Sequence, residues 1–67
     1  MNFKNVIETL FYNQLVEIIV PDSNGDDLSV GVDKVGNIKK ADATIYDNSE
    51  VVAMIAKDNI LKIYVDY

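Results

Sequence analysis

The stretch Leu15–Val32, LVEIIVPDSNGDDLSVGV, decides the fold because two apolar segments flank a cluster of turn residues. The first segment, residues 15–20, is β-branched and apolar on both faces except at Glu17. This pattern predicts a strand that is covered on two sides. Pro21 should end that strand, because proline cannot donate a backbone hydrogen bond.

The segment 21–27 is dense in turn-forming residues and includes the pair Asn24-Gly25, which adopts positive φ angles at little cost. It predicts the turn of a hairpin. Beyond the turn, Leu28, Val30 and Val32 alternate with small or polar residues. The alternation predicts a second strand with one buried face and one solvent-exposed face.

The N-terminal residues predict an amphipathic helix over residues 3–12. Its apolar positions recur at helical spacing. They are Phe3, Val6, Ile7, Leu10 and Phe11. Either Asn2 or Asn5 can supply the N-cap, since asparagine side chains accept hydrogen bonds from the first free amides of a helix.

The second half predicts another hairpin. Residues 50–56 are expected to form a strand apolar on both faces, residues 57–59 a tight turn, and residues 60–67 a last strand. In that strand one face carries Leu61, Ile63, Val65 and Tyr67, and the other carries Ile60, Lys62, Tyr64 and Asp66. The segment 34–48 is compatible with a crossover loop, a short strand or one helical turn. The longest apolar run, residues 51–56, is far shorter than the roughly 20 residues that cross a bilayer.

These elements predict one α+β domain over residues 1–67, with an N-terminal helix followed by four or five antiparallel strands. Either the helix lies on an open sheet, or the strands curl into a small barrel-like form. The doubly apolar strands 15–20 and 50–56 favour the barrel or a self-association surface, because one short helix cannot cover both faces of a sheet.

The amino-acid composition narrows the range of functions that this chain can have. The 67 residues include 11 Asp or Glu against 6 Lys or Arg, which gives a net charge of −5, and they include no His and no Cys. The usual general base, thiolate nucleophile and zinc ligands are therefore missing. We expect no enzymatic activity, no cofactor, no metal and no direct binding to nucleic acid or membrane. The first residues lack the pattern of a secretory signal, so the expected location is the cytoplasm.

The acidic charge is concentrated in the first half of the chain. Residues 1–33 contain one lysine and six carboxylates, whereas residues 34–67 contain five lysines and five carboxylates. Carboxylates gathered on a hairpin can attract a basic protein surface. The predicted partner-binding residues are Glu17, Asp22, Asp26, Asp27, Asp33 and the tyrosine Tyr64. The alternative is that acidic turns merely keep a small domain soluble.

A calcium loop is a weaker interpretation of the same segment. Asp22, Asn24, Asp26 and Asp33 match positions 1, 3, 5 and 12 of the EF-hand pattern. However, Asp27 stands where that pattern needs glycine, and strands rather than helices are predicted on either side. An ordinary acidic turn explains these residues better.

In several segments the pattern of apolar and polar residues resembles that of a loose group of small, uncharacterised helix-plus-antiparallel-strand proteins from phages and mobile elements of Gram-positive bacteria. The segments are residues 3–8, 16–20, 28–31, 47–55 and 61–65. A second likeness, carried by residues 56–60, is to the closing strand pair of Sm-like barrels, but the Arg-Gly step that binds RNA in those proteins is missing.

The likeness to mobile-element proteins implies a short accessory protein that acts by binding. Many such proteins block host defence systems. The resulting hypothesis is an anti-CRISPR-like inhibitor whose carboxylates mimic nucleic acid in the cationic channel of a defence nuclease. The alternative is a structural or assembly subunit that forms a homodimer or larger homo-oligomer through its apolar strand faces.

Overall fold

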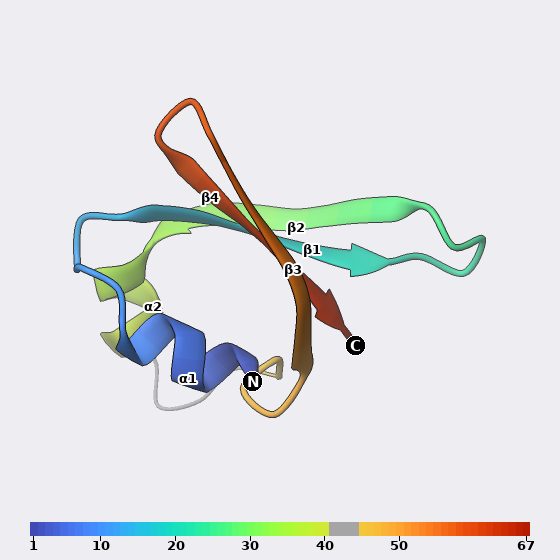
Figure 1. The fold of residues 1–67 in the computed structure, drawn as a ribbon, viewed down its shortest axis with the longest axis horizontal. Coiled ribbons are helices and arrows are strands. Elements are labelled where there is room, and N and C mark those ends of the chain that lie inside the picture. Colours follow the sequence, from blue (N-terminus) through green and yellow to red (C-terminus); the bar gives the residue numbers. More distant parts are fainter. Residues whose placement is uncertain (41–44) are drawn as a thin grey trace.

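The computed structural model describes residues 1–40 and 45–67. Over these residues each of two helices is followed by a pair of strands (Figure 1). They are α1 (Phe3–Glu8), β1 (Leu15–Pro21), β2 (Asp27–Lys34), α2 (Val35–Lys40), β3 (Glu50–Lys57) and β4 (Ile60–Asp66). The α+β class is as predicted, and none of the described helices is long and apolar enough to cross a membrane.

The strands form one open sheet in the order β2-β1-β4-β3. Each hairpin is antiparallel, but the central strands β1 and β4 pair in parallel, with Leu15 opposite Ile60. The prediction of an all-antiparallel sheet was therefore wrong, and so was the preference for a barrel. Parallel neighbours need a long crossover connection, and the path from β2 through α2 to β3 supplies it. Because β2 and β3 lie at opposite edges, the sheet stays open.

The helix α1 ends earlier than its apolar spacing predicts. Asn2, rather than Asn5, is the N-cap, and its side chain accepts a hydrogen bond from the backbone N–H of Asn5. At the other end the hydroxyl of Thr9 donates to the carbonyl of Val6 over 2.8 Å. This bond competes with continuation of the helix. Phe11 consequently leaves the apolar stripe and is 88% exposed.

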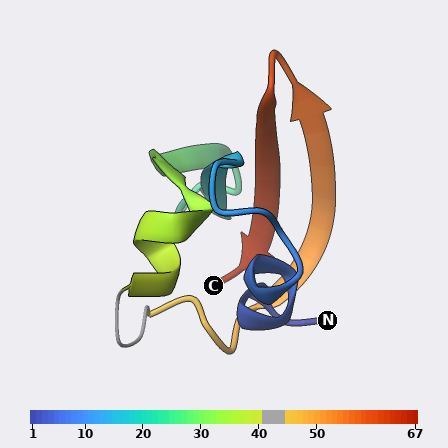
Figure 2. The same ribbon diagram turned by 90° about the vertical axis from the view of Figure 1, so that its left-hand side faces the viewer.

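Both helices lie on the same side of the sheet (Figures 1 and 2), and the core fills the space between them and the inner sheet face. The core cluster consists of Phe3, Val6, Ile7, Val16, Val20, Val35, Ile63 and Val65. Of the two faces predicted for residues 60–67, the one with Leu61 turns toward the core at Ile63 and Val65, which are fully buried, whereas Tyr67 at its end is 64% exposed. The undecided segment 34–48 contains α2, and its residues 41–44 lie outside the described part.

A bulge lies in each edge strand. In β2, Ile18 faces Gly31 and Ile19 faces Ser29, so Val30 is the extra residue, and Gly31 has a φ of 148°. A bulge shifts by one residue the alternation of side chains between the two faces of the strand. Leu28 and Val32 therefore lie on opposite faces, and the predicted buried face of this strand was wrong: all of β2 is exposed. In β3 the extra residue is Val52.

Candidate functional site

The turn between β1 and β2 forms a compact acidic tip made of Asp22, Asp26 and Asp27. The carboxylate of Asp22 accepts hydrogen bonds from the backbone N–H groups of Asn24, at 2.8 Å, and Asp26, at 3.0 Å. Gly25 supplies the positive φ that this turn needs, 83°. The carboxylate of Asp22 therefore shapes the turn. Those of Asp26 and Asp27 are exposed, and neither takes part in an ion pair among the described residues.

Glu17 lies on the outer face of the sheet, away from the helices. Its carboxylate accepts a hydrogen bond of 2.7 Å from the hydroxyl of Ser29 and lies 4.0 Å from the ammonium group of Lys62. Tyr64 is half-buried two residues further along β4, opposite Ile19 of β1. Glu17 therefore has a nearby counter-ion within the sheet and lies apart from the acidic tip.

Asp33 lies at the far end of β2, beside α2. Its carboxylate accepts a hydrogen bond of 2.8 Å from the side-chain amide of Asn37 and another of 2.8 Å from the backbone N–H of Lys34. The bond from Asn37, followed by that from Lys34, lowers the pKa of Asp33 below its ordinary value.

The predicted acidic surface is thus divided among the hairpin tip, the middle of the outer face and the start of α2. Asp27 and Asp33 are separated by the length of β2, roughly 20 Å at about 3.4 Å per residue. That separation exceeds the Debye length of about 8 Å at physiological salt. Of the predicted site residues, the structure brings together Asp22, Asp26 and Asp27 at the hairpin tip, places Glu17 and Tyr64 on neighbouring strands, and leaves Asp33 apart from both groups.

The doubly apolar segment 50–56, which was expected to favour a barrel or a self-association surface, forms the edge strand β3 of the open sheet. The run 51–56 carries no charge, and every residue of β3 except Val51 is exposed. Val52 is 63% exposed, Met54 48% and Ile55 51%. A long apolar strand at the edge of a sheet is a template for pairing with another strand. The sequence feature that marks this strand is its charge-free run between Glu50 and Lys57, and its exposure follows from the strand order.

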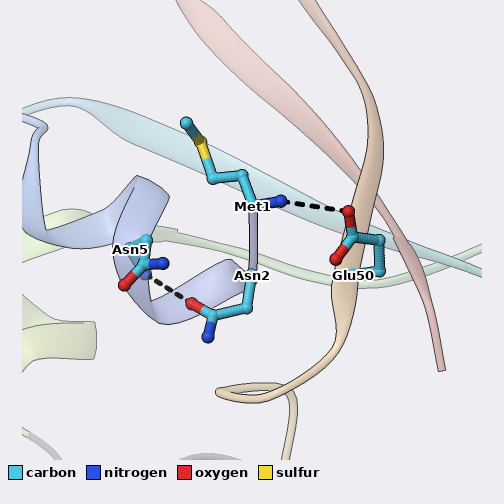
Figure 3. Close-up of polar contacts among 4 residues, drawn as sticks. All are labelled: Met1, Asn2, Asn5 and Glu50. Atoms are coloured by element: carbon cyan, nitrogen blue, oxygen red, sulfur yellow. Dashed lines mark hydrogen bonds and ion pairs between the residues drawn. The ribbon is translucent and has the colours of Figure 1, made fainter.

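The start of β3 is already covered by the N-terminal residues. The backbone N–H of Val51 donates to the carbonyl of Met1 over 2.9 Å, and Phe3 donates to the carbonyl of Ser49 over 2.9 Å. The amino group of Met1 also forms a 3.0 Å ion pair with the carboxylate of Glu50 (Figure 3). Backbone pairing from outside the hairpin is therefore seen along the first part of this edge.

The remainder of the edge has backbone groups that point outward. The turn at Asp58 and Asn59, with φ angles of 54° and 66°, joins β3 to β4. In such a turn the flanking residues, here Lys57 and Ile60, form a hydrogen-bonded pair. Bonded and non-bonded pairs alternate along antiparallel strands. Met54 and Ala56 therefore direct their N–H and C=O groups away from β4.

A hollow of about 290 Å³ lies between the bulge of β2 and α2. Its lining residues are Val16, Ile18, Val30, Gly31, Val32, Asp33, Ile38 and Tyr46. The one carboxylate among them, that of Asp33, accepts hydrogen bonds from Asn37 and Lys34 as described above. The lining is otherwise mostly aliphatic, so it offers few groups for chemistry or for orienting a ligand.

No group of three or more His, Cys, Asp or Glu side chains within residues 1–40 and 45–67 is arranged to hold a metal ion. Comparison of the chain with protein-family models, with curated proteins and with solved structures found no match.

Proposed function

We propose that this chain is a non-enzymatic protein-interaction domain that binds by adding a strand to its β3 edge. The observation that carries the proposal is the position of the uncharged run 51–56 in an exposed edge strand. The added strand supplies backbone hydrogen bonds to Met54 and Ala56, and apolar side chains that cover Val52 and Ile55. Main-chain bonding of this kind is a common mode of peptide recognition.

The opposite edge, β2, is less suited to receive a strand. Its ends carry charge at Asp27, Asp33 and Lys34, and the bulge at Val30 and Gly31 interrupts its middle. Charged side chains and bulges are the devices that keep natural edge strands from pairing. In β3 the bulge at Val52 lies near the start, so the segment from Ala53 to Lys57 keeps regular pairing geometry.

A synthetic peptide copying residues 50–57 tests strand addition directly. Titrated into the labelled chain, it should shift the amide resonances of Met54 and Ala56 more than those of β2. Val52→Lys should abolish the shifts because it puts a charge into the apolar run. Val32→Lys is the matched control, since Val32 is 50% exposed in the other edge strand. Equal loss in both variants, or shifts confined to β2, would exclude β3 as the binding edge.

A second proposal keeps the hypothesis of a phage-type inhibitor that mimics nucleic acid. It is supported by the exposed carboxylates of Asp26 and Asp27, which lie at the end of a projecting hairpin (Figure 1). The test uses a defense nuclease of the CRISPR type with a cationic channel. Asp26→Lys with Asp27→Lys should remove inhibition, whereas Val52→Lys should not. Inhibition that is unchanged by the two aspartate substitutions, or by high salt, would contradict the mimicry.

A further inference from the structure

We infer that the strand received by β3 is β3 of a second copy of the chain, paired antiparallel about a two-fold axis near Met54. The inference rests on the proposed function, strand addition at the β3 edge. The resulting sheet would run β2-β1-β4-β3-β3-β4-β1-β2 across the two copies.

The ends of β3 carry opposite charges, Glu50 at the start and Lys57 at the end. Antiparallel pairing of two copies along residues 52–57 leaves Glu50 outside the paired segment but brings Lys57 of each copy toward the exposed carboxylate of Glu50 in the other, which the amino group of Met1 also contacts. Parallel pairing would place like charges side by side. Opposite charges across neighbouring strands are favourable and like charges are unfavourable. The charge pattern of β3 is therefore complementary to itself in the antiparallel direction.

The location of the net charge favours the same arrangement. Residues 34–67 carry no net charge, whereas the acidic tip belongs to β1 and β2, and β2 is at the opposite edge of the sheet from β3. Two copies joined through β3 keep their acidic tips at the two far ends of the combined sheet. Parallel joining through β2 would place the acidic hairpins of the two copies side by side, which like-charge repulsion opposes, and antiparallel joining through β2 is disfavoured by its bulge at Val30 and Gly31.

The geometry also sets the size of the contact. Met1, Asn2 and Phe3 occupy the edge beside residues 49–51, so the segment open to a second copy is about residues 52–57. A strand of that length spans roughly 20 Å. The interface falls at the low end of specific interfaces. A two-fold contact uses the same surface on both copies and closes at a dimer. We therefore expect a weak, concentration-dependent dimer.

Sedimentation equilibrium with two charge variants tests this inference. The wild-type chain should pass from monomer to dimer between about 10 µM and about 1 mM, as expected for a small interface. Glu50→Lys and Lys57→Glu should each weaken the dimer about tenfold, because each change places like charges across the interface. An equimolar mixture of the two variants should restore dimerisation, since every contact in the mixed dimer is again attractive.

The mixture separates charge complementarity from local damage. Glu50→Lys also removes the ion pair with Met1, and a loss caused by that change would not be restored by mixing. A wild-type chain that stays monomeric at about 1 mM while still binding the 50–57 peptide would overturn self-pairing and leave strand addition intact. A dimer that neither charge variant weakens would overturn the antiparallel arrangement. A dimer that Val52→Lys leaves unchanged would exclude β3 altogether.

Discussion

The backbone N–H of Val51 donates a 2.9 Å hydrogen bond to the carbonyl oxygen of Met1, on the side of β3 that faces away from β4. After the bulge at Val52, the backbone N–H and C=O groups that point away from β4 belong to Met54 and Ala56. The N-terminal residues thus cover the edge up to the bulge, and the apolar part of the strand begins where they end. This relationship defines the surface on which the functional proposal depends.

The ion pair between Met1 and Glu50 should contribute little to stability. Both side chains are 63% exposed, so water screens the pair. We expect Glu50→Gln to lower the free energy of unfolding by less than about 1 kcal/mol, as is typical of surface ion pairs. Urea unfolding of the dilute, monomeric chain measures this quantity. A larger loss would mean that the ion pair holds the N-terminal segment in place.

Substitutions at the centre of the core should lower the free energy of unfolding far more than loss of this surface ion pair. Ile63 is fully buried in the central strand β4, so Ile63→Ala leaves a cavity and should cost about 2–5 kcal/mol. The total free energy of unfolding of a small domain is only about 5–15 kcal/mol, so we expect much of the variant to be unfolded. Circular dichroism in a urea series provides the measurement. The control Val32→Ala, at a half-exposed site, should cost less than about 1 kcal/mol. Similar costs at the two sites would contradict the described core.

The bulge in β2 should depend on Gly31. Its φ of 148° is one that side-chain-bearing residues rarely adopt, although the space around a new Cβ atom is open. We expect Gly31→Ala to cost about 1–3 kcal/mol through backbone strain alone. Thermal unfolding compared with Val30→Ala, which lacks this strain, provides the test. A fully stable Gly31→Ala chain would mean that β2 can pair with β1 without this bulge.

The carboxyl of Asp33 should titrate below its ordinary pKa, because Asn37 and Lys34 donate hydrogen bonds to its charged form. A lowered pKa in the folded state means stability that is present above the ordinary pKa and lost as the pH falls through the folded value. Asn37→Ala should move the pKa of Asp33 back toward the ordinary value. Carbon-detected NMR titration follows this carboxyl. An unchanged pKa in Asn37→Ala would exclude the side-chain amide as the main cause.

Local sequence patterns predicted the strands and turns well. The β-branched segment 15–20, the Asn-Gly turn and the alternation in residues 60–67 each depend on short-range preferences, and each reappears as β1, the first hairpin turn and β4. The parallel pairing of β1 with β4 depends on contacts between residues about 45 positions apart. Short-range periodicity carries no information about such a pairing.

The site was less predictable for the same reason. The charge count placed the acidic residues in the first half correctly, but the bulge and the length of β2 separate Asp33 from the hairpin tip. Glu17 is paired with Lys62 only because β1 and β4 are neighbours. The run 51–56 was visible in the sequence. Its exposure follows from the strand order, which makes β3 an edge.

Amide hydrogen exchange of Met54 and Ala56, measured across a range of protein concentrations, tests the central claim most directly. Both amides point away from β4, so they should exchange rapidly in the dilute chain and become protected as the concentration rises. The amide of Val51, already bonded to Met1, should show a smaller change. Fast exchange at Met54 and Ala56 that does not change with concentration or with added 50–57 peptide would contradict strand addition at β3.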